Sequence, residues 1–307
     1  MNSLMIETKN LTKTYGGQTV VNAVNLHVRQ GKIYGLLGRN GAGKTTIMKM
    51  ILGLTKMTSG EAEAFGQSIR GQGKAIYPRI GAMIETPGFY QNLTGTENLE
   101  IFALLRGTAG PDAVKNALEI VGLPYRDKKL YRAYSLGMKQ RLGIANAILH
   151  DPELLILDEP TNGLDPIGIA EMRDLIKKFS VERGKTILIS SHILPEIALL
   201  ADDIGILDHG VLLEEDSMEE LEKKNRKYIS LKVSDIPKAT LILEQQFHLA
   251  EYSVQDESTL RLYDTGLDLA ALNKALVLQD VAVLSSSVCN DTLEDYFKKV
   301  TGGEGIA

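Results

Sequence analysis

Hydrophobic and polar positions alternate along residues 4–34, with turn signals at Gly16-Gly17 and at residues 30–31. Alternation with a period of two is typical of strands that bury one face, so this stretch predicts antiparallel strands. A continuous apolar run, "KIYGLLG", follows at 32–38. Such a run is expected of a strand that is buried on both faces.

Beyond this run the apolar positions take a helical spacing that is interrupted by short buried runs. A helix is predicted to begin near Lys44. The other predicted helices cover 96–106, 111–121, 137–149 and 167–183, and the predicted buried strands cover 153–158, 186–190 and 204–207. Strands that alternate with helices predict an α/β fold with a parallel sheet.

The pattern changes after a charged segment at 217–227, which predicts a helical linker. The following residues read as β-α-β-β-α-β, with helices at 236–247 and 267–277, and a last helix is predicted in 291–302. This order is that of the split βαβ, ferredoxin-like arrangement. We therefore predict two domains, residues 1–216 and a smaller α+β accessory domain at 225–307.

Composition limits the classes of function. The 307-residue chain is 44% hydrophobic and carries a net charge of -5, so it can build a core and has no strongly basic character for nucleic acid. Its one cysteine, Cys289, cannot form an internal disulfide, which fits a reducing compartment. No apolar run reaches the roughly 18 residues of a membrane helix. We expect a soluble chain whose membrane role, if it has one, comes through a partner.

The segment "GRNGAGKTT" at 38–46 satisfies G-x-x-x-x-G-K-[ST], and it follows a buried strand and opens a helix. Glycines let successive N–H groups face one point, and a helix N-terminus adds positive potential there. Lys44 offers a charge to the β- and γ-phosphates of ATP, and the Thr45 hydroxyl offers a ligand to Mg²⁺. The predicted phosphate-binding loop consists of Gly38, Arg39, Asn40, Gly41, Ala42, Gly43, Lys44, Thr45 and Thr46.

A second motif, "LLILDEPT" at 154–161, ends a buried strand in two acids. Asp158 is predicted to hold Mg²⁺, as a Walker B aspartate does. Glu159 is predicted to act as the general base on the attacking water. The alternative is a solvated strand end without chemistry.

The segment "YSLGMKQRLGIANAI" at 134–148 resembles the signature segment of ATP-binding cassette (ABC) ATPases. Ser135 and Gly137 follow the family pattern, as do Gln140 and Arg141, whereas Leu136 departs from its usual L-S-G-G-Q form, as do Tyr134 and Met138. Three further family marks occur in order along residues 4–216, and they are Tyr15 for adenine stacking, Asp165 in the D-loop and His192 in the switch segment.

The resemblance implies a P-loop NTPase cassette with an antiparallel β subdomain, a RecA-like core and a helical subdomain. It also implies a head-to-tail cassette dimer that holds two ATP molecules, in which Ser135, Gly137 and Asp165 lie at the interface. Whether that dimer pairs identical or different cassettes stays open. The expected partners are separate transmembrane permease subunits and no nucleic acid, which implies a cytoplasmic protein, peripheral on the inner face of the cell membrane.

Glu85, in "IGAMIETPGFY" at 80–90, stands where most cassettes carry a glutamine. Together with S-L-G-M-K-Q at 135–140, this glutamate resembles the subfamily that exports bacitracin and lantibiotic peptides. The resemblance implies that Glu85 faces Mg²⁺ beside Asp158 and Glu159 and takes part in catalysis. The alternative is a carboxylate that caps or solvates a loop.

The function that this implies is the ATP-hydrolysing subunit of a membrane ABC exporter, acting on peptide antibiotics in resistance or immunity. Two alternatives stay open. One is a non-transport cassette ATPase, and the other is a regulatory switch built on the C-terminal domain. The sequence leaves open the transported substrate, the role of the C-terminal domain and the effect of Glu85 on turnover.

Overall fold

The computed structural model describes residues 3–85, 88–107, 112–224, 227–249, 251–290 and 293–301. The chain folds into two compact units, Met1–Glu219 with Val300–Ala307, and Glu220–Lys299. The predicted domain limits, 216 and 225, lie on either side of this division. Within the described ranges no helix combines the length and the apolar character needed to cross a membrane.

An antiparallel sheet forms the first part of the first unit. Its strands are β1 (Leu4–Tyr15), β2 (Gln18–Val24), β3 (His27–Arg29), β5 (Ser59–Ala64) and β6 (Gln67–Ser68). The order is β2-β1-β5-β6, and β3 also pairs with β1. The antiparallel strands predicted in 4–34 are confirmed. The sequence did not indicate β5, whose "SGEAEA" combines glycine, alanine and glutamate, residues that are depleted in strands.

The second sheet has the order β11-β10-β4-β9-β8-β7 and is parallel except for β11. Every residue of β4, β8 and β9 is buried, as the continuous apolar runs predicted. The strands are β4 (Ile33–Leu37), β7 (Ile80–Met83), β8 (Leu154–Asp158), β9 (Thr186–Ser191), β10 (Asp203–Asp208) and β11 (Val211–Ser217).

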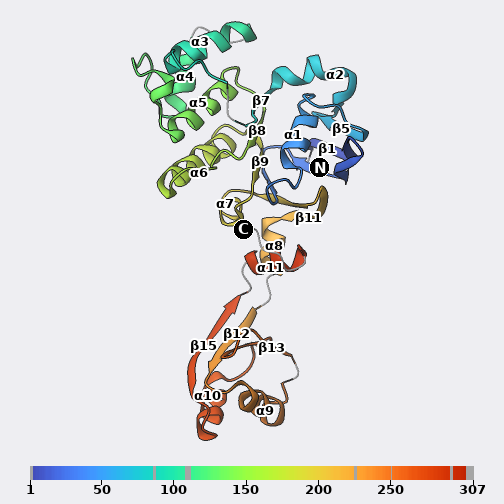
Figure 1. Cartoon of the computed structure of the whole chain (residues 1–307), viewed down its shortest axis with the longest axis vertical. Helices are drawn as coiled ribbons and strands as arrows, with labels where there is room; N and C mark the ends of the chain where they lie inside the picture. The colour runs from blue at the N-terminus through green and yellow to red at the C-terminus, as the bar shows by residue number, and fades with distance from the viewer. Residues whose placement is uncertain are drawn as a thin grey trace. The chain divides into compact units, whose positions relative to one another are not determined.

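Helices follow these strands along the chain, as the predicted α/β alternation requires. Figure 1 shows α3, α4 and α5 lying side by side as a helical region. Residue 111 of the predicted helix at 111–121 lies outside the described residues. The helices are α1 (Lys44–Ile51), α2 (Ile69–Ile76), α3 (Gly95–Arg106), α4 (Ala113–Ile120), α5 (Leu136–Ile148), α6 (Pro166–Val181) and α7 (Leu194–Ala198), with 3-10 turns at Tyr77–Arg79 and Tyr131–Ala133.

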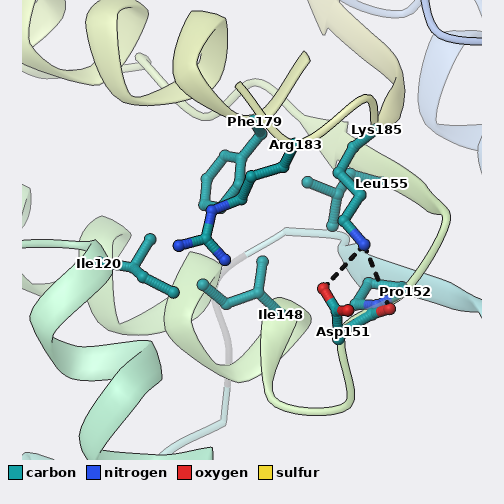
Figure 2. Close-up of a pocket in the computed structure, with 8 residues that line it drawn as sticks. All are labelled: Ile120, Ile148, Asp151, Pro152, Leu155, Phe179, Arg183 and Lys185. Atoms are coloured by element: carbon teal, nitrogen blue, oxygen red, sulfur yellow. Dashed lines mark hydrogen bonds and ion pairs between the residues drawn. The ribbon is translucent and has the colours of Figure 1, made fainter. Parts of the chain in front are cut away.

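The helical region joins the core of its unit through a small pocket between α4, α5, α6 and β8. Figure 2 shows Phe179 together with Ile120 and Ile148 around this pocket, and Lys185 turned toward Asp151. The Lys185 ammonium lies 2.7 Å from the Asp151 carboxylate. The pocket has a volume of only about 20 Å³, little more than a single water needs. Close packing therefore fixes α4 and the end of α5 to the core.

The second unit contains a four-stranded antiparallel sheet with the order β13-β14-β12-β15. This is the strand order of the ferredoxin-like arrangement, as predicted. The charged helix predicted at 217–227 ends earlier, because Lys227 already belongs to β12. Residues 225 and 226 of that prediction lie outside the described ranges, as do residues 291, 292 and 302 of the last predicted helix. The elements are α8 (Met218–Lys224), β12 (Lys227–Val233), α9 (Ile236–Phe247), β13 (Tyr252–Val254), β14 (Thr259–Leu262), α10 (Leu269–Leu278), β15 (Val283–Asn290) and α11 (Leu293–Val300).

Candidate nucleotide-binding and catalytic site

The predicted phosphate-binding loop connects β4 to α1, and its backbone requires glycine. Gly41 and Gly43 have left-handed φ values of 83° and 109°. A Cβ at Gly43 would also lie 2.8 Å from the carbonyl oxygen of Val20. The loop borders an open pocket of about 280 Å³. Its lining consists of Val20, Arg39, Asn40, Gly41, Gly43, Lys44, Thr45, Thr46, Glu159 and Asn162.

Two members of the predicted loop do not line this pocket. Ala42 is 4% exposed and belongs to the hydrophobic core. Gly38 acts through its carbonyl oxygen, which accepts a hydrogen bond from the Lys44 ammonium at 2.5 Å.

Lys44 places a buried positive charge at the pocket. Its side chain is only 5% exposed, and its ammonium also donates to the carbonyl of Arg39 at 3.1 Å and lies 3.1 Å from the Glu159 carboxylate. An ammonium has three donors, and these three contacts satisfy them, which offsets the cost of burying the charge. The structure thus fixes the cation at the wall of the pocket that the loop borders.

Asp158 and Glu159 lie at the end of β8 and are held by the neighbouring strand β9. The hydroxyl of Ser190 donates to one oxygen of the Asp158 carboxylate at 2.6 Å and accepts from the backbone N–H of Glu159 at 3.0 Å. The Thr45 hydroxyl donates to the other Asp158 oxygen at 2.7 Å. Asp158 and Ser190 are direct cross-strand partners. The sequence analysis missed Ser190, because the pairing of β8 with β9 sets this contact and no local motif shows it.

Glu159 links the two basic groups of the site. One carboxylate oxygen faces Lys44, and the other lies 2.5 Å from the Nδ1 atom of His192. His192 follows β9 directly. The backbone of Glu159 has a φ of 49°, a left-handed conformation that aims its side chain out of the strand direction. The structure therefore brings together the predicted base and the predicted switch histidine, 33 residues apart in sequence.

The predicted signature and D-loop residues meet in a second place. Ser135 caps α5 by accepting from the N–H of Met138 at 3.3 Å, and Asp165 caps α6 by accepting from the N–H of Gly168 at 2.8 Å. Ser135, Gly137 and Asp165 line one open cleft of about 610 Å³. This cleft shares no lining residue with the pocket at Lys44.

Tyr15, the predicted adenine-stacking residue, ends β1 and is half exposed. The Lys13 ammonium lies 4.4 Å from the centre of its ring. Tyr15 is not among the residues that line the phosphate-loop pocket. Its ring is thus accessible from solvent.

Glu85 lies two residues beyond β7, with a φ of 58°, and its carboxylate is 2.6 Å from the ammonium of Lys49 on α1. The hydrogen bond that Lys49 donates to Glu85 raises the pKa of Lys49 above its ordinary value. Within the described part of the chain, no three His, Cys, Asp or Glu side chains form a group that could hold a metal. The expected cluster of Glu85 with Asp158 and Glu159 is therefore not formed in this structure, since Lys49 holds the Glu85 carboxylate. Thr86 and Pro87, in the same motif, lie outside the described residues.

Comparison with known proteins agrees with this geometry. The family model described as "ABC transporter" matches residues 21–162. The chain is 53% identical to the bacitracin transport ATP-binding protein BcrA of Enterococcus faecalis, over 99% of this chain and 98% of that protein. It is 46% identical to the lantibiotic transport ATP-binding protein SrtF of Streptococcus pyogenes, over 71% of this chain and 95% of that protein.

Solved structures show the same fold. An ATP-binding subunit of an ABC transporter has a TM-score of 0.64 and 30% identity, and the match covers 72% of this chain and 93% of that one. A dimeric post-hydrolysis ATP-binding cassette bound to ADP and Pi has a TM-score of 0.63 and 25% identity, with 70% and 99% of the two chains covered. From the phosphate loop, the paired acids and these relatives together, the chain belongs to the ABC transporter family and is one of its ATP-binding, ATP-hydrolysing members.

Proposed function

We propose that this chain is the ATP-hydrolysing subunit of a membrane exporter for peptide antibiotics of the bacitracin or lantibiotic kind, acting in resistance or immunity. One observation carries the proposal. The identity of 53% to a bacitracin transport ATP-binding protein extends over 99% of the chain, so it includes the second unit as well as the cassette. The lantibiotic transport relative matches only 71% of the chain. Of the two, the bacitracin relative therefore matches the whole architecture.

The chain's own groups account for ATP hydrolysis. The loop amides and Lys44 bind the β- and γ-phosphates, with phosphate oxygens taking over the acceptor positions around the ammonium. Glu159 accepts the proton of the attacking water, and His192 at 2.5 Å orients its carboxylate. Asp165, Ser135 and Gly137 line the second cleft, which is where the partner cassette binds.

The residues at the loop fit Mg²⁺, because two hard oxygen donors, the Thr45 hydroxyl and the Asp158 carboxylate, lie 2.7 Å apart beside the phosphate pocket. When bound, Mg²⁺ neutralises charge on the β- and γ-phosphates. Glu85 remains a proposed further ligand and catalytic contributor. Its pair with Lys49 is exposed, and exposed ion pairs contribute little stability, so the carboxylate can turn toward a cation at small cost.

We also propose how this ATPase assembles with a second cassette and with permease subunits. Two cassettes, identical or different, pair head to tail, so that Ser135 of one faces the phosphate loop of the other. Separate permease subunits carry the substrate path, and the cassette lies on the cytoplasmic face of the cell membrane as a peripheral subunit. The dimeric relative bound to ADP and Pi supports the pairing.

The test expresses the chain together with its permease in a bacitracin-sensitive host. The expected result is a raised inhibitory concentration of bacitracin, and its loss with Glu159→Gln, which keeps shape and removes the base. The variant should still bind ATP and accumulate as a cassette dimer. Equal resistance from parent and variant would show that hydrolysis at this site does not drive export.

A further inference from the structure

The sheet of the second unit has two edge strands, β13 and β15, and β15 is the longer one. It is eight residues long, with the sequence VLSSSVCN and neither a charge nor a proline. Among the residues that the structure describes, β15 pairs only with β12. Natural edge strands usually avoid further pairing by being short or by carrying charges, prolines or bulges. β15 has neither the short length nor the charges, and its pairing with β12 is irregular at one place, between Val283 and Ser285.

The opposite edge of the same sheet is built differently. β13 has only three residues, and the turn that follows it contains Asp256 and Glu257. A short strand next to charges is a poor template for another chain. The sheet therefore offers one edge for pairing and blocks the other.

An exposed apolar strip accompanies the open edge. Leu284 and Val288 of β15 are 61% and 56% exposed, and Val277 and Leu278 at the end of α10 are 58% and 74% exposed. α10 packs against β15, and Figure 1 shows the two side by side. Exposed apolar side chains beside an unpaired strand edge are typical of an interaction surface.

The sequence of β15 is self-complementary around Ser286. If two copies pair antiparallel with Ser286 at the centre, Leu284 of each copy lies opposite Val288 of the other. A centre at Leu284 would instead put Val288 opposite Asp280, and a centre at Val288 would leave Leu284 opposite a residue beyond the strand. Of these three registers, only the one centred at Ser286 therefore places both Leu284 and Val288 of each copy opposite an apolar residue of the other.

The centre of this register carries an unusual polar group. The Ser286 hydroxyl is buried, and within the described residues it has no hydrogen-bond partner. Buried hydroxyls are normally paired. Cross-strand serine pairs hydrogen-bond, so a second copy of Ser286 directly opposite supplies the missing partner.

We propose that β15 pairs with β15 of a second copy of this chain, antiparallel around Ser286, joining the two four-stranded sheets into one continuous sheet. The absence of charge on the strand and its self-complementary pattern point to a second copy as the occupant. This contact uses no residue of the nucleotide site, so it is separate from the proposed ATP-dependent cassette dimer.

The test measures self-association of the full chain without nucleotide, by sedimentation velocity over a concentration series. L284E and V288K each place a charge opposite an apolar residue and should weaken the dimer about tenfold. The double variant L284E/V288K should recover most of that loss, because each new carboxylate lies opposite the new ammonium of the other copy. V254E, on the opposite edge at a position 54% exposed, is the matched control and should leave the dimer unchanged.

Far-UV circular dichroism establishes that each variant is folded. A chain that stays monomeric without nucleotide would overturn the proposal, as would a dimer that neither single variant weakens. Two weakening single variants without recovery in the double variant would also overturn the pairing around Ser286, because the charges would then not face each other.

Discussion

Ser190→Ala is expected to disturb both acids of the proposed catalytic site, although it removes only one oxygen atom. Ser190 is fully buried on β9, where it donates to Asp158 at 2.6 Å and accepts from the N–H of Glu159 at 3.0 Å. The substitution removes a hydrogen bond to a carboxylate and leaves a backbone donor without its acceptor. Both effects arise at the point where β8 presents its acids to the pocket.

The magnitude follows from these two contacts. A hydrogen bond to a charged group contributes about 1.5–3 kcal/mol, and an orphaned buried donor costs about 1–3 kcal/mol. Allowing for relaxation, we expect the free energy of unfolding to fall by about 3 kcal/mol. In a unit of this size that lowers the Tm by about 6–12 °C. Because Asp158 and Glu159 also lose their orientation, kcat/KM for ATP should fall at least about tenfold.

The neighbouring serine provides the control. Ser191 is also buried on β9, at 3% exposure, but its hydroxyl accepts from the N–H of Ile193 at 2.9 Å and contacts neither acid. Ser191→Ala should lower the Tm less and leave kcat/KM nearly unchanged. Thermal unfolding and steady-state ATPase rates at saturating Mg²⁺ measure both quantities. If the two variants lose the same stability and the same activity, Ser190 contributes only packing, and the argument from its contacts is wrong.

Three further outcomes follow from the site and the domain division. Lys44→Ala should abolish tight ATP binding in calorimetry, because it removes the buried cation that faces the pocket; an unchanged affinity would exclude this loop as the phosphate site. Glu85→Gln should raise the Mg²⁺ concentration for half-maximal hydrolysis several-fold, and Glu85→Ala should raise it further. Lys49→Gln removes the ion pair with Glu85 but keeps the Glu85 carboxylate, so it should not raise this Mg²⁺ concentration. If the Mg²⁺ dependence of all three variants overlaps that of the parent, Glu85 acts only in its loop. Removal of residues 220–307, which takes the second unit and the end of the first, should leave a folded ATPase, because every predicted motif residue precedes residue 220; circular dichroism and turnover measure this. A fragment that precipitates would show that the two units fold as one.

The sequence predicted those features that local chemistry determines. The glycines of the loop are required by left-handed backbone and close approach, and the apolar runs of β4 and β8 are required by burial on both faces. Ser190 and Lys49 escaped prediction because their roles come from tertiary contacts, one across a strand pair and one between a helix and a loop. Neither contact leaves a trace in the spacing of residues along the chain.

The topology of the central sheet explains why residues so far apart form one site. In a parallel sheet the carboxyl ends of all strands meet at one edge, and loops at that edge carry function. The strand order β4-β9-β8-β7 therefore lines up, along this edge, the phosphate loop, His192, the two acids and Glu85. Lys44 and Glu159 come within 3.1 Å of each other although β9 lies between β4 and β8. Glu85 follows the outermost strand of the row, and its carboxylate lies 2.6 Å from the ammonium of Lys49 on α1. Lys49→Gln removes this partner and keeps the Glu85 carboxylate, so it tests the proposed metal role of Glu85 more directly than any change to Asp158 or Glu159.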